Sequence, residues 1–130
     1  VALARASGSR DRAAEARLLR ASVVQTRGDL DTALRECTAI IAEARSNDWV
    51  ELWAHALQQR GTVHFALEQW EAACVDFTVA VELCREAGLE AAQLQAAELA
   101  LLVATDRAQT EALRAQRDVP RASHPIWGGR

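Results

Sequence analysis

Apolar residues recur along the chain with the spacing of one helical face. Between residues 30 and 44 they are separated by 3, 1, 3, 3, 1 and 3 positions, as on a helix with one buried side. The same intervals return between residues 70 and 84, so each position lies 40 residues after its counterpart. The first set is Leu30, Ala33, Leu34, Cys37, Ile40, Ile41 and Ala44, and the second is Trp70, Ala73, Cys74, Phe77, Ala80, Val81 and Cys84. The pattern predicts an internal repeat of amphipathic helices.

The segments before these two stripes also match at the offset of 40, and a weaker third copy begins near Leu94. Each unit therefore has the pattern of a helix, a short turn and a second helix. We expect six helices, at about 10–27, 30–45, 49–66, 69–87, 89–105 and 107–117. The predicted fold class is all-α, with about three antiparallel helix pairs stacked as a solenoid. The expected organisation is an N-terminal extension (1–9), a repeat domain (10–117, in units of about 10–47, 48–88 and 89–117) and a C-terminal tail (118–130).

Turn and capping residues agree with these boundaries. Gly28 and Gly88 are placed to end helices, because glycine readily takes the left-handed backbone of a helix C-terminus. Asp29 can cap the helix that follows it. Asp48, with Glu51 three residues later, has the pattern of a capping box at the start of the third helix.

The second unit resembles the tetratricopeptide repeat (TPR), a family of stacked helix pairs. Small residues and aromatic residues stand at the packing positions of that family: Gly61, Trp70, Ala73, Phe77 and Ala80. The resemblance covers about residues 10–117, and its period of 40 is similar to the long-helix variety found in bacterial regulators and in kinesin light chain. Arg60 departs from the family pattern, which has leucine there. The resemblance implies a right-handed superhelical stack that binds a peptide or a helix in a concave groove.

The groove of that family is lined by the first helix of each pair, which places a set of mostly polar residues there. The tentative groove residues are Glu15, Gln25, His55, Gln58, Thr62, Phe65, Gln95 and Glu98, together with Leu18, Ser22, Leu102 and Thr105. This lining has no Arg, so we do not expect it to clamp the C-terminal carboxylate of a peptide. For any single position, a solvated helix face is the simpler interpretation.

Charge is distributed unevenly along the chain. The formal net charge is −3, and every basic residue is Arg. Residues 1–27 hold six Arg and two acidic residues, residues 28–106 hold four Arg and fourteen acidic residues, and residues 107–130 hold five Arg and two acidic residues. Because basic ends can attract an acidic middle, we expect weak self-association that declines with salt. The basic ends lack interleaved aromatic residues, so direct nucleic-acid binding is not expected.

Candidate chemistry is sparse. The chain has no phosphate-binding loop, no HExxH and no GxSxG motif, and we expect no catalytic residue, no cofactor and no metal. His55 and His64 are nine positions apart, on opposite sides of one helix. The three cysteines are expected to be reduced and to pack inside a cytoplasmic protein, although a Cys–His nucleophile pair between helices remains an alternative. No apolar run is long enough to cross a membrane. Trp127 lies in the tail and is a candidate for contact with a partner.

These observations favour a protein–protein interaction module within a larger cytoplasmic protein; the absence of Met also fits a part of a longer chain. The alternative is the ligand- or peptide-sensing domain of a bacterial transcription regulator. A sensor needs a closed apolar pocket, whereas a scaffold needs only an open groove. An enzyme is the third class, and no site in the sequence supports it.

Overall fold

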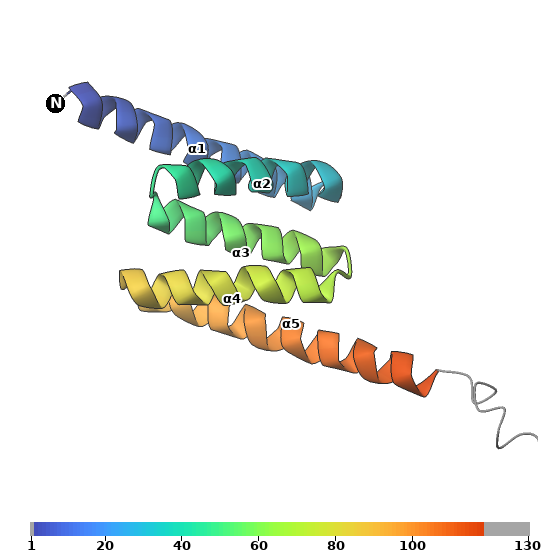
Figure 1. Ribbon diagram of the computed structural model, residues 1–130. Coiled ribbons are helices and arrows are strands. Elements are labelled where there is room, and N and C mark those ends of the chain that lie inside the picture. The colour runs from blue at the N-terminus through green and yellow to red at the C-terminus, as the bar shows by residue number, and fades with distance from the viewer. Residues whose placement is uncertain (1, 119–130) are drawn as a thin grey trace, which may run out of the picture.

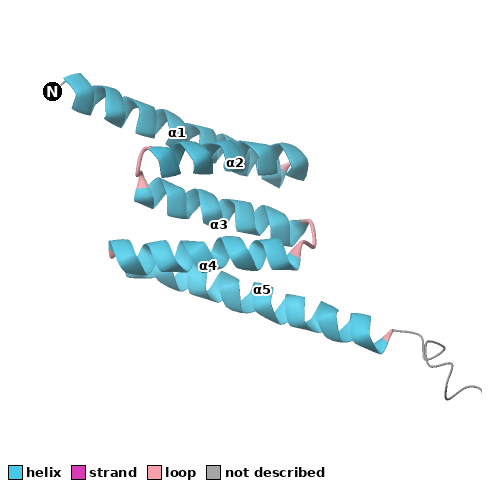
Figure 2. Ribbon diagram, viewed as in Figure 1, coloured by secondary structure: helices cyan, strands magenta, loops and turns pink. Residues whose placement is uncertain are grey.

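The protein folds as a stack of consecutive helices. The computed structural model describes residues 2–118, and for residues 2–8 it describes the backbone alone. The helices are α1 (Ala2–Thr26), α2 (Leu30–Ser46), α3 (Val50–Ala66), α4 (Trp70–Ala87) and α5 (Ala91–Arg117). Each packs against the next one along the chain, and α1 also contacts α3 (Figure 1). Only short turns join them, and the described residues include no strand (Figure 2). The predicted all-helical repeat solenoid is confirmed.

The predicted third helix pair does not form as two helices. In place of helices at 89–105 and 107–117, α5 runs without a break from Ala91 to Arg117. The expected break at Asp106 has neither Gly nor Pro within residues 105–109, and Asp106 lies inside the continuous helix. At the other end, α1 begins at Ala2, so residues 2–9 of the expected extension are helical. The expectations for Trp127 and for tail residues 119–130 fall outside the described residues.

The same turn ends each of the first four helices, at intervals of 20 residues. Gly28, Asp48, Glu68 and Gly88 have φ values of 89°, 58°, 60° and 62°. In each turn the next residue donates its backbone N–H to a carbonyl five positions back, as Trp49 does to Ala44 at 2.9 Å. The predicted helix ends at Gly28 and Gly88 are therefore confirmed, whereas the predicted capping box at Asp48 is wrong. Asp48 closes α2, and Trp49 caps α3 without a side-chain hydrogen bond.

The two apolar stripes lie in the interior as predicted. In each stripe five of the seven residues are buried, and the first and third, such as Leu30 and Leu34, are half-buried. Ten of the twenty buried apolar residues in the described chain are alanine. Short side chains let the helix axes approach closely, and the larger residues, such as Ile40 and Phe77, fill the space between neighbouring helices.

Gly61 marks a close contact between α3 and α4. An added Cβ at this position would lie 2.5 Å from Cε1 of Phe77, which is closer than two carbon atoms can approach. The ring of Phe77 therefore packs directly on the backbone of α3. Gly61 is buried inside a helix, where glycine is otherwise unfavourable, so the close approach explains its presence.

Candidate binding groove

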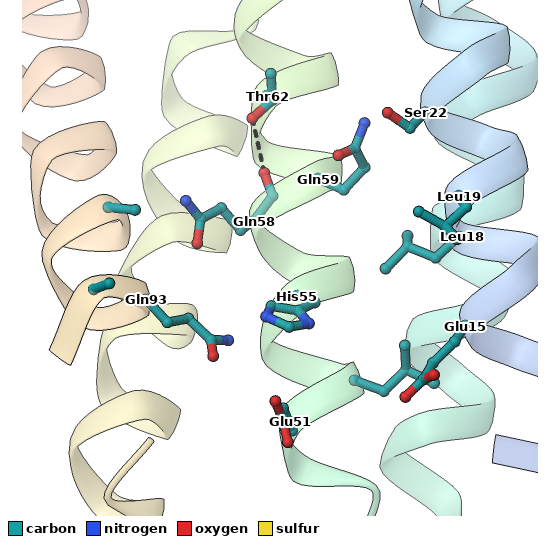
Figure 3. Close-up of a pocket in the computed structure, with 13 residues that line it drawn as sticks. Glu15, Leu18, Leu19, Ser22, Glu51, His55, Gln58, Gln59, Thr62 and Gln93 are labelled. Carbon is teal, nitrogen blue, oxygen red and sulfur yellow. Dashed lines mark hydrogen bonds between the residues drawn. The ribbon is translucent and has the colours of Figure 1, made fainter. Parts of the chain in front are cut away.

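A surface groove lies between the odd-numbered helices. Its volume is about 780 Å³, and its walls come from α1, α3 and α5 (Figure 3). The lining residues are Glu15, Leu18, Leu19 and Ser22 from α1; Glu51, Leu52, His55, Gln58, Gln59 and Thr62 from α3; and Ala92, Gln93 and Ala96 from α5. The first helix of each pair thus contributes to one continuous surface.

Helical spacing explains how α3 presents its side chains to the groove. Glu51, His55, Gln58 and Thr62 follow one another at intervals of 4, 3 and 4 residues, so they form a line along one face. The hydroxyl of Thr62 donates to the carbonyl oxygen of Gln58 at 2.9 Å, which satisfies the Thr62 donor within the helix (Figure 3). The floor of the groove is therefore a row of polar side chains held on a rigid helix.

Six of the twelve predicted groove residues line this groove: Glu15, Leu18, Ser22, His55, Gln58 and Thr62. Gln25 does not, and its side-chain oxygen accepts a hydrogen bond from Gln59. Phe65 packs edge-on against Trp70, with ring centroids 4.8 Å apart.

The remaining four residues belong to α5, whose rotation differs from the expected one: Gln95, Glu98, Leu102 and Thr105. Ala97 and Ala104 form its buried face, which turns Gln95 and Glu98 away from α3. Gln95 is exposed, and Glu98 accepts a hydrogen bond from Arg85 at 3.3 Å. Gln93 takes the groove position that the 40-residue offset assigns to Gln95.

The groove is acidic at one end. Glu15 and Glu51 are both exposed, and His55 lies near them, whereas none of the lining residues is Arg (Figure 3). Neither carboxylate takes part in an ion pair among the described residues. A cationic group of a ligand would meet favourable electrostatics there, and an anionic group would be repelled.

Apolar and hydrogen-bonding groups complete the lining. Leu52 belongs to the main core cluster, the half-buried Leu18 packs against that cluster, and Leu19 is 71% exposed. On α5, the Nε2 atom of Gln93 is buried and has no hydrogen-bond partner. A buried amide without a partner is costly, and the carbonyl oxygen of a ligand could satisfy it after a small rotation of the side chain.

A buried polar cluster lies on the side of α3 that faces away from the groove. Arg60 donates two hydrogen bonds to Asp76 of α4, both at 2.8 Å, and Asp76 is only 3% exposed. Nε2 of His64 lies 3.7 Å from the same carboxylate. The hydrogen bonds to Asp76 raise the pKa of Arg60. The cluster fixes α3 against α4, and the sequence interpretation missed it, although Arg60 breaks the family pattern and Asp76 stands beside the second apolar stripe.

The surroundings of Cys37 and Cys84 make these two thiols unreactive. Cys37 is fully buried, and burial raises its pKa to about 11, although the nearby Arg60 opposes this shift. Burial also raises the pKa of Cys84. Since the thiolate is the nucleophilic form, both residues are neutral at physiological pH and act as small apolar side chains. Cys74 is half-buried, with its sulfur 3.9 Å from the hydroxyl of Thr105.

In the described part of the chain, no three His, Cys, Asp or Glu residues come together as a metal site. None of the helices between residues 2 and 118 has the length and apolar character needed to span a bilayer.

The fold and the groove together define a class of protein, the all-helical repeat solenoid with a surface lined by alternate helices. Comparisons with protein-family models, with curated proteins and with solved structures give no match.

Proposed function

We propose that this chain is a TPR-like protein-interaction module that binds a peptide or a helix in the groove between α1, α3 and α5. The observation that carries the proposal is the continuous lining by alternate helices, which offers polar, apolar and acidic groups along one surface. An extended or helical segment can use such a surface through hydrogen bonds and a few apolar anchors.

The character of the lining favours a scaffold over a small-molecule sensor. The groove is open to solvent, and its α3 floor carries Glu51, His55, Gln58 and Thr62, whereas a sensor pocket is enclosed and mostly apolar. The acidic end favours a ligand with a basic residue there and an apolar residue over Leu18 and Leu19. The three free cysteines, two of them buried, support placement in the cytoplasm, and the proposed module has no catalytic role.

A random library of peptides about 12 residues long, selected for binding to the 130-residue chain, tests the proposal. Enriched peptides should combine Arg or Lys with Leu-like residues, and fluorescence polarisation measures their affinity. The double variant Glu15→Gln and Glu51→Gln should weaken binding at least about fivefold, since it removes the charges that attract the basic residue. Glu82→Gln, an exposed carboxylate on α4, is the matched control and should leave the affinity unchanged. If the enriched peptides bind the Glu15→Gln and Glu51→Gln double variant as tightly as the unchanged chain, this groove is not the binding surface. A selection that enriches no peptide would contradict the proposal as well.

A further inference from the structure

The side chains that face the groove follow the same spacing on α3 and on α5. On α3 the row runs from Glu51 to Thr62 with intervals of 4, 3 and 4 residues. The same intervals on α5 give the row Ala92, Ala96, Leu99 and Val103, and its first two residues line the groove. Positions at these intervals share one face of a helix. Leu99 and Val103, which together form the α5 anchor, therefore continue the α5 wall of the groove beyond Ala96.

The α5 anchor is apolar, and no helix of the described chain buries it. Leu99 is 62% exposed and Val103 is 44% exposed, and both lie off the buried face that contains Ala97 and Ala104. The helices α1, α3 and α5 run in the same direction, and α5 lies at the edge of the stack with its C-terminal half projecting beyond α4 (Figure 1). The α5 anchor therefore lies toward the Thr62 end of the groove. Exposed apolar residues next to a groove mark an interaction surface.

The opposite end of the groove is acidic. Glu15 and Glu51 are exposed there, and Asp11 lies four residues before Glu15 on the same face of α1. The Oδ1 atom of Asp11 is buried and has no hydrogen-bond partner among the described residues. A buried carboxylate oxygen without a partner is costly, so a cationic group bound beside it would gain charge-assisted hydrogen bonds. Asp11, Glu15 and Glu51 together form the acidic site.

The floor between the two ends carries amide side chains that suit an extended backbone. Gln58 lies in the α3 row, and the Nε2 atom of Gln93 is buried without a partner in the described part of the chain. An extended peptide offers free backbone N–H and C=O groups to these amides, whereas a helix pairs its own. Glu51 and Thr62 are 11 positions apart, which corresponds to about 16 Å along α3 and to about five residues of extended peptide. One short segment can therefore reach both ends.

We propose that this surface recognises an extended basic peptide in two parts. The acidic site binds a cationic side chain, and the α5 anchor packs against an aliphatic side chain no more than about five residues away. Charge complementarity selects the basic peptide, since the groove lining and the α5 anchor contain no Arg. The proposal rests on the peptide-binding function proposed above and deepens it, because it adds a second specificity site on α5 and fixes the order of the two groups along the groove.

Peptides enriched on the unchanged chain are the probes, and fluorescence polarisation measures their affinity. The double variant Leu99→Gln and Val103→Thr gives α5 the last two residue types of the α3 row and removes the apolar contact. It should weaken binding at least about tenfold, as expected when the burial of aliphatic side chains is lost. Leu113→Gln, at a residue 65% exposed on the projecting half of α5, is the matched control and should leave the affinity unchanged. Circular dichroism of each variant confirms that it folds.

A double-mutant cycle identifies the peptide residue that meets the α5 anchor. Changing the aliphatic residue of the peptide to Ala should weaken binding to the unchanged chain and scarcely affect binding to the double variant. Changing the basic residue of the peptide to Gln should weaken binding to both. Proline at one position or more between these two peptide residues should cost less than about threefold, because an extended backbone accommodates proline and a helix interior does not. Loss of binding with proline at every intervening position would reject the extended form.

The outcomes separate this proposal from the peptide-binding function itself. If the Glu15→Gln and Glu51→Gln variant weakens binding and the Leu99→Gln and Val103→Thr variant does not, the groove binds peptides without the α5 anchor. If neither variant changes binding, the proposed function fails as well. A chain ending at Asp118 that binds the peptides at least about fivefold more tightly would show that residues 119–130 occupy the anchor. A dimer of the unchanged chain that the α5 variant abolishes would assign the anchor to a second copy, and either result overturns the proposal.

Discussion

At the scale of single residues, the chain has an unusual titration behaviour. It contains neither Lys nor Tyr, so cysteine thiols are the only side chains that change charge between about pH 9 and pH 11. Burial raises the pKa of Cys37 from 9.0 to about 11 and also raises that of Cys84. The folded state therefore keeps these protons at pH values where the unfolded chain has released its own.

Stability should fall as the pH rises from about 9 to about 11. In that window the unfolded chain binds fewer protons than the folded one, so the free energy of unfolding decreases with pH. A shift from 9.0 to about 11 at Cys37 corresponds to about 2 to 3 kcal/mol over the whole window. Urea unfolding at intervals from pH 8 to pH 11 measures this decline. Cys37→Ala should flatten the profile, whereas Val75→Ala, at an exposed residue that carries no titratable group, should preserve it. An equal decline in the Cys37→Ala variant would assign the effect to other groups.

At the scale of helices, the pair of Arg60 and Asp76 joins α3 to α4. Arg60→Leu would install the leucine of the family pattern but leave Asp76 buried without its partner. We expect this single change to cost about 3 to 5 kcal/mol of unfolding free energy. The double change Arg60→Leu and Asp76→Leu should recover most of that loss, because two apolar side chains need no partner. Chemical denaturation of both variants measures the difference.

The control for this prediction is Glu98→Gln, which breaks the exposed pair of Arg85 and Glu98 and should cost less than about 1 kcal/mol. A double variant no more stable than the Arg60→Leu variant would mean that the cost arises from overpacking by leucine and not from the unpaired carboxylate.

Helix ends show how far the sequence determines these elements. The turns at Gly28 and Gly88 are predictable from the sequence, because glycine is the usual residue with positive φ. Asp48 and Glu68 adopt the same positive-φ conformation. Acidic residues are also common at helix starts and inside helices, so the residue type alone does not predict a helix end at these two positions. The continuity of α5 through Asp106 was also not predicted, because aspartate is common at helix starts and is equally tolerated on the exposed face of a helix.

At the scale of the whole molecule, most groove residues on α1 and α3 were predictable and those on α5 were not. Glu15, His55, Gln58 and Thr62 follow from the repeat, since α1 and α3 are related by the same offset of 40. The rotation of α5 is instead set by how Ala97 and Ala104 pack on α4. That packing depends on tertiary contacts, which a sequence offset does not contain.

Because each helix contacts mainly its neighbours in sequence, unfolding should begin at the ends of the stack. Backbone amides of α2, α3 and α4, which have helices on both sides, should exchange most slowly with deuterium. Amides in the first turns of α1 and in the projecting half of α5 should exchange fastest. Native-state hydrogen exchange followed by mass spectrometry measures this order. Uniform protection across all five helices would instead show that the stack unfolds as one cooperative unit.

The close contact of Gly61 with Phe77 has an evolutionary consequence. One period earlier, the corresponding positions hold Ala21 and Cys37, both buried. In the second repeat, Gly61 has no side chain and its counterpart Phe77 has a large ring. In the first repeat, Ala21 has a methyl group and its counterpart Cys37 has a small thiol. The two repeats therefore fill a similar volume with different pairs of residues. Substitutions at 61 and 77 should therefore be accepted only in coupled steps. Relatives of this protein with alanine at 61 should carry a smaller residue than phenylalanine at 77, and that covariation would identify the helix pair from aligned sequences alone.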